Sequence, residues 1–105
     1  KMAKPKVSQI KIKVGKLGSC IGTFYNNGAA NVMIIDSVMV AKKNRGKGIG
    51  TAVMEKALAI ARKRNVDSVE LVVNSDNEIA KKLYKKVGFE KTNKEYYRLI
   101  LNKKK

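Results

Sequence analysis

The chain lacks the residues on which many enzyme chemistries depend. It contains no histidine, no tryptophan, one proline and one cysteine in 105 residues. Without an imidazole there is no base for a Ser-His-Asp or Cys-His site. The single cysteine, Cys20, excludes an internal disulfide framework and leaves too few ligands for a zinc site. The sequence therefore predicts no metal centre and no histidine-dependent catalysis.

Acidic residues are also scarce. Eight Asp and Glu stand against 24 Lys and Arg, which gives a formal net charge of +16, and 20 of the basic residues are lysines. Because arginine is preferred for bidentate recognition of phosphates and bases, this surface favours weak electrostatic association with nucleic acid over sequence-specific binding. With 44% hydrophobic residues the chain has enough apolar material for one core, so residues 1–105 are predicted to form one domain.

Long apolar runs are absent as well. No stretch approaches the roughly 18 apolar residues that span a bilayer, and the first residues do not read as a signal peptide. We expect a soluble, cytoplasmic protein.

The first half of the chain is typical of strands. Residues 7–14 alternate between apolar and polar, and residues 19–25 are joined to the next strand by Asn26-Asn27-Gly28, a strong hairpin signal. The almost unbroken apolar run from Asn31 to Val40 predicts a central strand that is buried on both faces.

The second half alternates between helices and strands. An apolar face predicts a helix over residues 49–64, followed by a strand at 68–73, so these elements form a βαβ unit. Asn74-Ser75-Asp76 is predicted to cap a second helix at 77–87, which Gly88 ends. Residues 89–91 and 96–101 are predicted to pair as a closing hairpin. The predicted order is β-β-β-α-β-α-β-β.

A glycine-rich loop precedes the first helix: Arg45-Gly46-Lys47-Gly48-Ile49-Gly50-Thr51. The N–H groups at a helix N-terminus have no intrahelical partner and attract anions, and glycines let an anion approach the backbone. The loop lacks the Gly-Lys-Ser/Thr of a Walker loop and the G-x-G-x-x-G spacing of a dinucleotide fold. A loop that only turns the chain is disfavoured, because Arg45 and Lys47 repel each other beside these N–H groups unless an anion is present.

Two segments resemble one family. Arg45-x-x-Gly48-x-Gly50 after a strand is similar to the acetyl-CoA pyrophosphate loop of GNAT-type N-acetyltransferases. Asn77-x-x-Ala80-x-x-Leu83-Tyr84-x-x-x-Gly88-Phe89 is similar to the other characteristic segment of that family. The resemblance covers residues 7–101. It implies an α/β (α+β) domain with a mixed, mostly antiparallel sheet and two helices, and acetyl-CoA as acetyl donor.

The resemblance also implies roles for particular positions. The pantetheine arm would pair with the backbone of a strand, the pyrophosphate would be held by loop N–H groups, and Asn77 would contact the cofactor arm. The Val40 N–H would polarise the thioester carbonyl, and Tyr84 would protonate the departing thiolate. The strand positions are Val38, Met39 and Val40, and the loop positions are Arg45, Gly46, Lys47, Gly48, Ile49, Gly50 and Thr51.

A base is needed to deprotonate the amine. Asp36 interrupts an apolar strand at a position where many relatives carry a Glu. We expect burial to make its carboxylate a base strong enough to deprotonate the amine, and we expect it to act through a water. Glu70 is a second candidate. The alternatives are an Asp36 in solvent or paired with a lysine, and a Tyr84 that only packs on a helix face. Cys20 is predicted to be a small buried residue rather than a nucleophile.

The sequence departs from the family at its start. The usual fold begins with a strand and two helices whose loop covers the acceptor site, whereas this sequence starts at what matches the second strand. We expect the acceptor site to be open, covered by a second subunit in a homodimer, or suited to an extended polypeptide. The predicted function is transfer of an acetyl group from acetyl-CoA to a primary amine, including amines on proteins or peptides. The alternative is a non-catalytic module that binds CoA or a polyanion.

Overall fold

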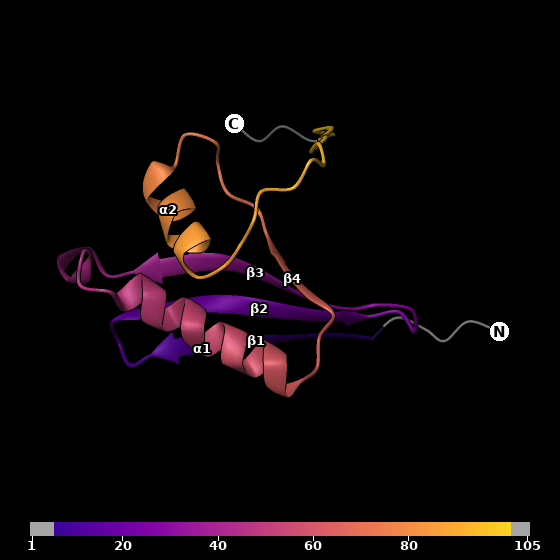
Figure 1. The fold of residues 1–105 in the computed structure, drawn as a ribbon, viewed down its shortest axis with the longest axis horizontal. Coiled ribbons are helices and arrows are strands. Elements are labelled where there is room, and N and C mark those ends of the chain that lie inside the picture. The colour runs from indigo at the N-terminus through magenta and orange to yellow at the C-terminus, as the bar shows by residue number, and fades with distance from the viewer. Residues whose placement is uncertain (1–5, 102–105) are drawn as a thin grey trace.

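A computed structural model describes residues 6–101 and arranges them around one four-stranded sheet (Figure 1). The strands lie side by side in the order β1-β2-β3-β4. The elements in chain order are β1 (Lys6–Val14), β2 (Gly18–Asn26), β3 (Asn31–Val40), the 3₁₀ helix η1 (Lys42–Asn44), α1 (Ile49–Lys63), β4 (Ser68–Leu71) and α2 (Glu78–Lys86).

Strands β1, β2 and β3 form an antiparallel meander. The predicted Asn-Gly turn joins β2 to β3: Gly28 has a φ of 89°, and its N–H donates to the side-chain oxygen of Asn26 at 2.8 Å. Asn27 accepts from the N–H groups of Ala29 and Ala30. The hairpin predicted at this turn is confirmed.

The connection through α1 makes β4 parallel to β3, as the predicted βαβ unit requires. Pairing runs only from Val32 opposite Ser68 to Ile35 opposite Leu71. The sheet is thus mixed and mostly antiparallel, and with two α-helices the predicted fold class is confirmed.

The core lies between α1 and one face of the sheet. The sheet side chains that reach it are joined by Val53, Met54, Ala57 and Ala61 of α1, and all of them are almost fully buried. These sheet side chains are Ile12, Cys20, Phe24, Met33 and Ile35.

The predicted burial of β3 on both faces is wrong. Met33 and Ile35 are buried under α1, but Ile34 between them is 40% exposed and Asp36 is exposed. An unbroken apolar run shows that a strand is hydrophobic, but it does not show how many faces are covered. Here α1 covers one face, and the other carries exposed side chains.

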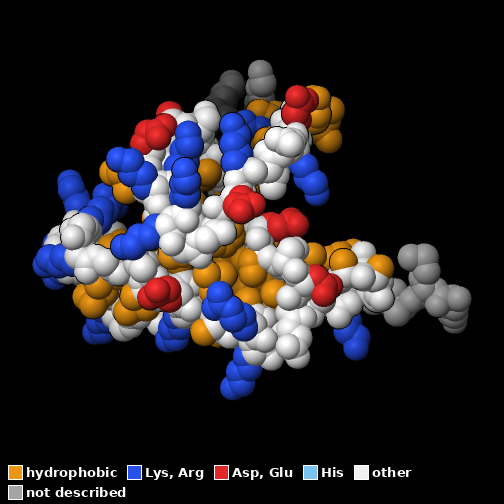
Figure 2. All heavy atoms as spheres, in the orientation of Figure 1, with side chains coloured by type: hydrophobic (Ala, Val, Ile, Leu, Met, Phe, Trp, Pro, Cys, Tyr) orange, Lys and Arg blue, Asp and Glu red, His pale blue; other side chains and the backbone are white. Residues whose placement is uncertain are grey.

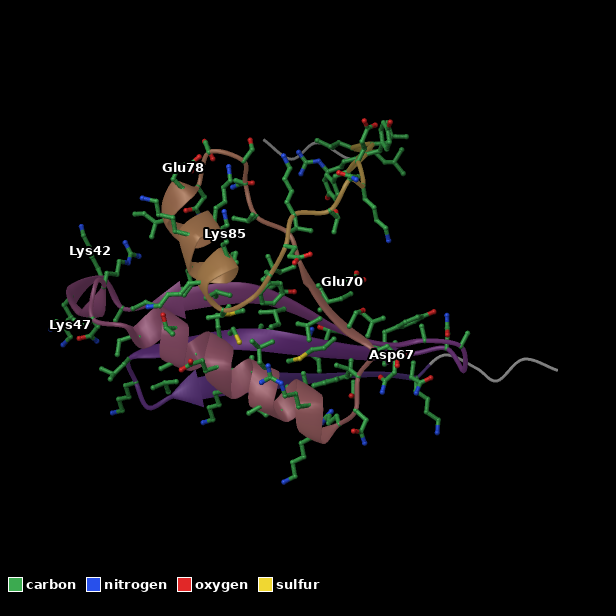
Figure 3. All side chains as sticks on the ribbon, in the orientation of Figure 1. Lys42, Lys47, Asp67, Glu70, Glu78 and Lys85 are labelled. Atoms are coloured by element: carbon green, nitrogen blue, oxygen red, sulfur yellow. The ribbon has the colours of Figure 1, made fainter. Side chains whose placement is uncertain are left out.

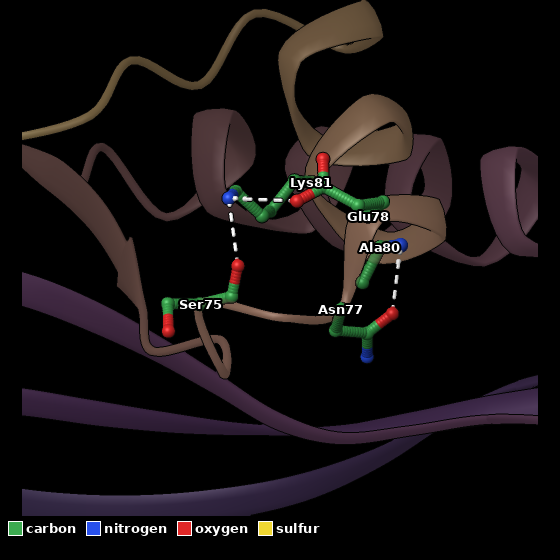
Figure 4. Close-up of polar contacts among 5 residues, drawn as sticks. All are labelled: Ser75, Asn77, Glu78, Ala80 and Lys81. Carbon is green, nitrogen blue, oxygen red and sulfur yellow. Dashed lines mark hydrogen bonds and ion pairs between the residues drawn. The ribbon is translucent and has the colours of Figure 1, made fainter.

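Helix α2 begins one residue later than predicted, and its cap is Asn77 rather than Asn74-Ser75-Asp76. The Asn77 side-chain oxygen accepts from the Ala80 N–H at 3.1 Å, and Lys81 joins the Ser75 carbonyl and the Glu78 carboxylate (Figure 4). Gly88, with a φ of 109°, follows the helix as predicted.

The predicted closing hairpin is absent, because residues 89–101 contain no strand. Tyr97 and Leu101 are 84% and 88% exposed. An alternating pattern makes a strand only where a neighbour accepts its backbone hydrogen bonds. Strand β4 ends at Leu71, two residues before its predicted end at 73, and so offers a short edge.

No helix within residues 6–101 has both the length and the apolar character needed to cross a bilayer. In the same residues, no three Cys, Asp or Glu side chains gather closely enough to hold a metal ion.

Candidate functional site

The loop between β3 and α1 presents a row of unpartnered backbone donors. Gly46 and Gly48 have φ values of 79° and 80°, and Gly48 is the N-cap of α1. The first helical hydrogen bond runs from the Ala52 N–H to the Gly48 carbonyl at 3.1 Å. Within residues 6–101, the N–H groups of residues 46–51 find no backbone acceptor. This arrangement suits a phosphate anion.

Gly50 serves a different purpose from the other two loop glycines. A Cβ at this position would lie 3.0 Å from Cδ2 of Leu83 on α2. The absence of a side chain therefore lets α2 approach the first turn of α1. The contact packs α2, the helix that carries Tyr84, against the first turn of α1.

Strand β3 parts from β4 where the second half of β3 begins. β4 pairs with β3 only as far as Ile35, so residues 36–40 have no partner strand on that side among residues 6–101. On the other side, the register with β2 shifts between Ser19 and Ile21, and Ser37 adopts a φ of 53°. This bulge adds a residue to β3 where the gap opens.

The backbone of β3 directs donors into this gap. The Ala41 N–H donates to the Leu17 carbonyl at 3.0 Å, on the β2 side. Because successive N–H groups along a strand point to opposite sides, the Val40 N–H faces away from β2. This orientation leaves the Val40 N–H free of β2, and its predicted role as the carbonyl-polarising donor stays a prediction.

Tyr84 is half-buried against the core and meets Phe89 edge-on, with ring centroids 6.1 Å apart. Burial raises the pKa of its hydroxyl, and the neighbouring Cys20 thiol raises it further. The phenol is therefore protonated at neutral pH and available as a proton donor.

Cys20 lies in the core at the register shift between β2 and β3. It is fully buried on β2 opposite the bulge, between the paired positions Ser19 and Ile21. Burial raises the pKa of the Cys20 thiol, and the charge of Asp36 raises it further. A neutral, buried thiol agrees with the prediction that Cys20 is not a nucleophile.

Asp36 is exposed, so its predicted burial is wrong. Its Cα partner on β2 is Ile21, and both side chains stand on the face of the sheet opposite α1. Glu70, the second candidate, is exposed on β4 and paired with Ile34 (Figure 3). The role of either carboxylate as the base stays a prediction.

Positive charge gathers around the loop and α2. Lysine and arginine side chains cover this end of the molecule (Figure 2), and Lys42 and Lys47 project from it (Figure 3). Four lysines lie on α2, of which Lys81 pairs with Glu78 at 3.3 Å. Beside the loop, a cavity of about 360 Å³ lies between the two helices. Its lining residues are Thr51, Glu55, Leu58, Arg62, Lys86 and Val87.

Residues 10–89 match the model of the acetyltransferase (GNAT) family. The chain belongs to the GNAT family. An uncharacterized N-acetyltransferase of Methanocaldococcus jannaschii is 45% identical over 56 residues, which are 53% of this chain and 25% of that protein. The mycothiol acetyltransferase of Beutenbergia cavernae is 44% identical over 45 residues, which are 43% of this chain and 15% of that protein.

Solved structures show the same fold for this GNAT chain. An integron cassette protein from the mobile metagenome of V. cholerae superposes with a TM-score of 0.72 at 31% identity, over 82% of this chain and 55% of that one. An acetyltransferase of Trypanosoma brucei superposes with a TM-score of 0.67 at 26% identity, over 81% and 59%. The matched segments thus span a quarter or less of the two curated relatives and just over half of these two structures.

Sequence reasoning proposed the loop, Asn77 and Tyr84 as site residues, and their roles stay predictions; it did not show that Cys20 lies at the register shift between β2 and β3. Its position depends on the register of β2 against β3, a long-range feature with no local signal in the sequence. The capping role of Asn77 was also missed, although an Asn directly before a helix is a cap signal.

Proposed function

We propose that the chain transfers an acetyl group from acetyl-CoA directly to a primary amine. The observation that carries the proposal is the row of unpartnered N–H groups at residues 46–51, directly beside the gap where β3 parts from β4. The loop fits a pyrophosphate because its two positive-φ glycines bear no Cβ and the surrounding charge is positive. The gap offers backbone donors to an extended arm.

The residues of the chain then have separate tasks. Bound acetyl-CoA supplies an activated thioester carbonyl. The Val40 N–H stabilises the negative charge that develops on the carbonyl oxygen as the amine nitrogen attacks the carbonyl carbon. The Tyr84 hydroxyl protonates the thiolate sulfur as the carbon–sulfur bond breaks. Asp36 accepts the proton that the amine nitrogen loses, through a water, and its exposure gives that water access.

Asn77 is assigned to the cofactor arm. Its side-chain oxygen is engaged in capping α2, so the amide nitrogen is the group that remains for the arm. One side chain would then order α2 and contact the ligand.

The acceptor is proposed to carry an amine in an accessible position, such as a protein or peptide chain, because Asp36 lies on an open sheet face. The lone, unpaired Cys20 suits a reducing compartment, and we place the protein in the cytoplasm. The second candidate function, a non-catalytic module that binds CoA or a polyanion, is favoured by the net charge of +16.

Two measurements on one sample separate these functions. Calorimetric titration with acetyl-CoA measures binding, and release of free CoA thiol over a panel of amines, peptides and acidic proteins measures transfer. Binding with acceptor-dependent thiol release supports the transferase. Binding without release for any acceptor favours the non-catalytic module, and absence of binding would refute both CoA-dependent functions.

A further inference from the structure

The first turn of α1 rests on β2 at Gly18, a residue outside both of the segments that resemble GNAT motifs. A Cβ at Gly18 would lie 2.8 Å from Cγ2 of Ile49, the first residue of α1, and 3.0 Å from Cγ2 of Val53, about one turn later. Ile and Val branch at Cβ and have one strongly preferred χ1 rotamer in a helix, so neither methyl group can easily turn aside. Gly18 therefore sets how closely the first turn of α1 approaches the sheet.

Gly18 is also tied to the end of β3. Its Cα partner in the register is Val40, and a Cβ on Gly18 would lie 3.1 Å from the Met39 carbonyl oxygen. From the loop before α1, Arg45 Nε donates to the Val40 carbonyl at 3.3 Å. The contacts of Gly18 thus join the two parts of the proposed cofactor site, which are the N–H groups of residues 46–51 and the Val40 N–H.

The other side of this first turn is held less rigidly. A Cβ at Gly50 would lie 3.0 Å from Cδ2 of Leu83 on α2 and 3.9 Å from Cγ2 of Val40. Leu83 can respond by rotating about χ1 or χ2, since its branch lies one carbon further from the backbone. At Gly18, by contrast, the neighbouring atoms belong to two β-branched side chains and a backbone carbonyl. The position of the first turn therefore depends more on β2 than on α2.

We propose that Gly18 is a positioning residue for acetyl-CoA. By admitting Ile49 onto β2, it sets the spacing between the N–H groups of residues 46–51 and the Val40 N–H. This role rests on the proposed function, in which the pyrophosphate of acetyl-CoA occupies the loop and its thioester lies at Val40. A ligand that spans both places requires the correct spacing, whereas inorganic pyrophosphate occupies the loop alone and does not.

Calorimetry with acetyl-CoA and with inorganic pyrophosphate, on the 105-residue chain and its variants, tests this spacing. Gly18→Ala is expected to move the first turn of α1 away from β2, because a methyl group added to a packed site forces the backbone to shift. We expect the Kd for acetyl-CoA to rise at least about tenfold. The Kd for pyrophosphate should stay within about threefold, because the loop donors move together with the first turn.

Gly22→Ala is the matched control on the same strand. The three atoms nearest to a Cβ at Gly22 belong to Met33, Ile12 and Ile10 of the sheet, and none belongs to α1. The closest, at 2.5 Å, is Cε of Met33, the end of a flexible side chain that can turn aside. Both Kd values should therefore stay within about threefold of those of the original chain.

A change on the helix side tests the same contact. Ile49→Ala removes the methyl group that rests on Gly18 and leaves the backbone N–H in place. It should also weaken acetyl-CoA binding more than pyrophosphate binding, because the first turn of α1 loses its support on β2. The double variant Gly18→Ala/Ile49→Ala returns a methyl group to the contact, so its Kd for acetyl-CoA is expected within about threefold of the original value.

Three results would overturn the positioning role. Unchanged acetyl-CoA binding by Gly18→Ala would show that the spacing does not depend on residue 18. Equal weakening for both ligands would show that the loop itself is damaged, and additive effects in the double variant would show that residues 18 and 49 act separately. If Gly18→Ala does not fold, as judged by circular dichroism, Ile49→Ala decides by the same comparison of ligands.

Failure of the proposed function gives a different result. An original chain that binds no acetyl-CoA would refute that function and the role of Gly18 with it. An original chain that binds acetyl-CoA but shows no binding of pyrophosphate up to about 10 mM would overturn the loop assignment on which the spacing depends. Normal acetyl-CoA binding by both the original chain and Gly18→Ala would leave the function standing and remove only the positioning role.

Discussion

Two regions of the fold differ in how much apolar surface they bury. The firm region consists of β1–β3 and α1, and the loose region consists of β4, α2 and residues 89–101. Strands β1–β3 and α1 contribute every almost fully buried side chain of the core, whereas β4 and α2 contribute none. Residues 89–101 extend from α2 without regular structure, and five of their apolar side chains are more than half exposed. Regions with little buried apolar surface open locally at lower free energy. The proposed cofactor gap lies between the two regions, so ligand binding should draw the loose region onto the firm one.

The largest effect is expected from a cavity in the firm region. Met54→Ala removes a fully buried side chain from α1 and should lower the free energy of unfolding by about 2–5 kcal/mol. Leu99→Ala, in a side chain that is 80% exposed, should change it by less than about 0.5 kcal/mol. Urea unfolding followed by circular dichroism measures both. Equal losses of unfolding free energy in the two variants would show that the two regions contribute equally to stability.

Loss of the candidate acid should affect turnover and leave binding intact. Tyr84→Phe keeps the ring that packs on Phe89 but removes the proton donor, so kcat should fall by about 100-fold or more. The Kd for acetyl-CoA should stay within about threefold, because the hydroxyl acts on the reaction rather than on the bound ground state. Tyr97→Phe, at an exposed position, is the control. A normal kcat in Tyr84→Phe would remove Tyr84 from the mechanism.

A carboxylate in the loop should prevent anion binding. Gly48→Glu places a negative charge beside the unpartnered N–H groups and should weaken acetyl-CoA binding by about 100-fold or more, since like-charge contact costs several kcal/mol. Gly28→Glu makes the same change at another positive-φ glycine with open space around it, in the β2–β3 turn. Calorimetry compares the two variants. Normal binding by Gly48→Glu would contradict the loop assignment.

The two tasks of Asn77 can be separated. Asn77→Ala removes the cap of α2 and should destabilise that helix by about 1 kcal/mol, seen as faster amide exchange in residues 78–86. Asn77→Asp retains a capping oxygen but lacks the amide nitrogen, so exchange should be unchanged while acetyl-CoA binds less tightly. If Asn77→Asp binds as well as the original chain, the residue serves only as a cap.

The smallest effect is expected at alkaline pH. The pKa of the Cys20 thiol is raised in the folded chain by burial and then by Asp36. As pH rises, the thiol therefore ionises in the unfolded chain before it ionises in the folded chain. The stability that the protonated thiol contributes is complete at lower pH and is lost as pH rises above about 8.5. Urea unfolding between about pH 7 and pH 10 should show a shallower decline for Cys20→Ala than for the original chain. Parallel declines in the two proteins would show that the Cys20 thiol does not contribute to the pH dependence of stability.

The firm region could be predicted from the sequence because its signals are local. Alternation in residues 7–14 and the Asn-Gly turn predicted the meander, and the apolar face of residues 49–64 predicted α1. The loop and Tyr84 were proposed as site residues from their resemblance to family motifs, and their roles stay predictions. The sequence could not show that only one face of β3 is covered, since apolar periodicity does not reveal a missing neighbour. The closing hairpin failed for the same reason, because residues 96–101 have the pattern of a strand but no paired edge.

The features that assemble the site depend on contacts between distant segments. The bulge at Ser37, the parting of β3 from β4 and the burial of Cys20 at the register shift all follow from strand register. Gly50 was predicted to allow anion approach, and the structure adds a second reason for a glycine there, since a Cβ would lie 3.0 Å from Leu83 of α2. No spacing rule in the sequence reports such a contact.

Amide hydrogen exchange resolved by residue, with and without acetyl-CoA, tests the central claim most directly. The account predicts that acetyl-CoA slows exchange at residues 38–40, at loop residues 46–51 and across α2, with little change in β1. Protection of the loop and α2 together would show that the ligand binds in the gap and draws the loose region onto the firm one. Binding without protection of residues 46–51, or protection confined to the face opposite α1, would contradict the account.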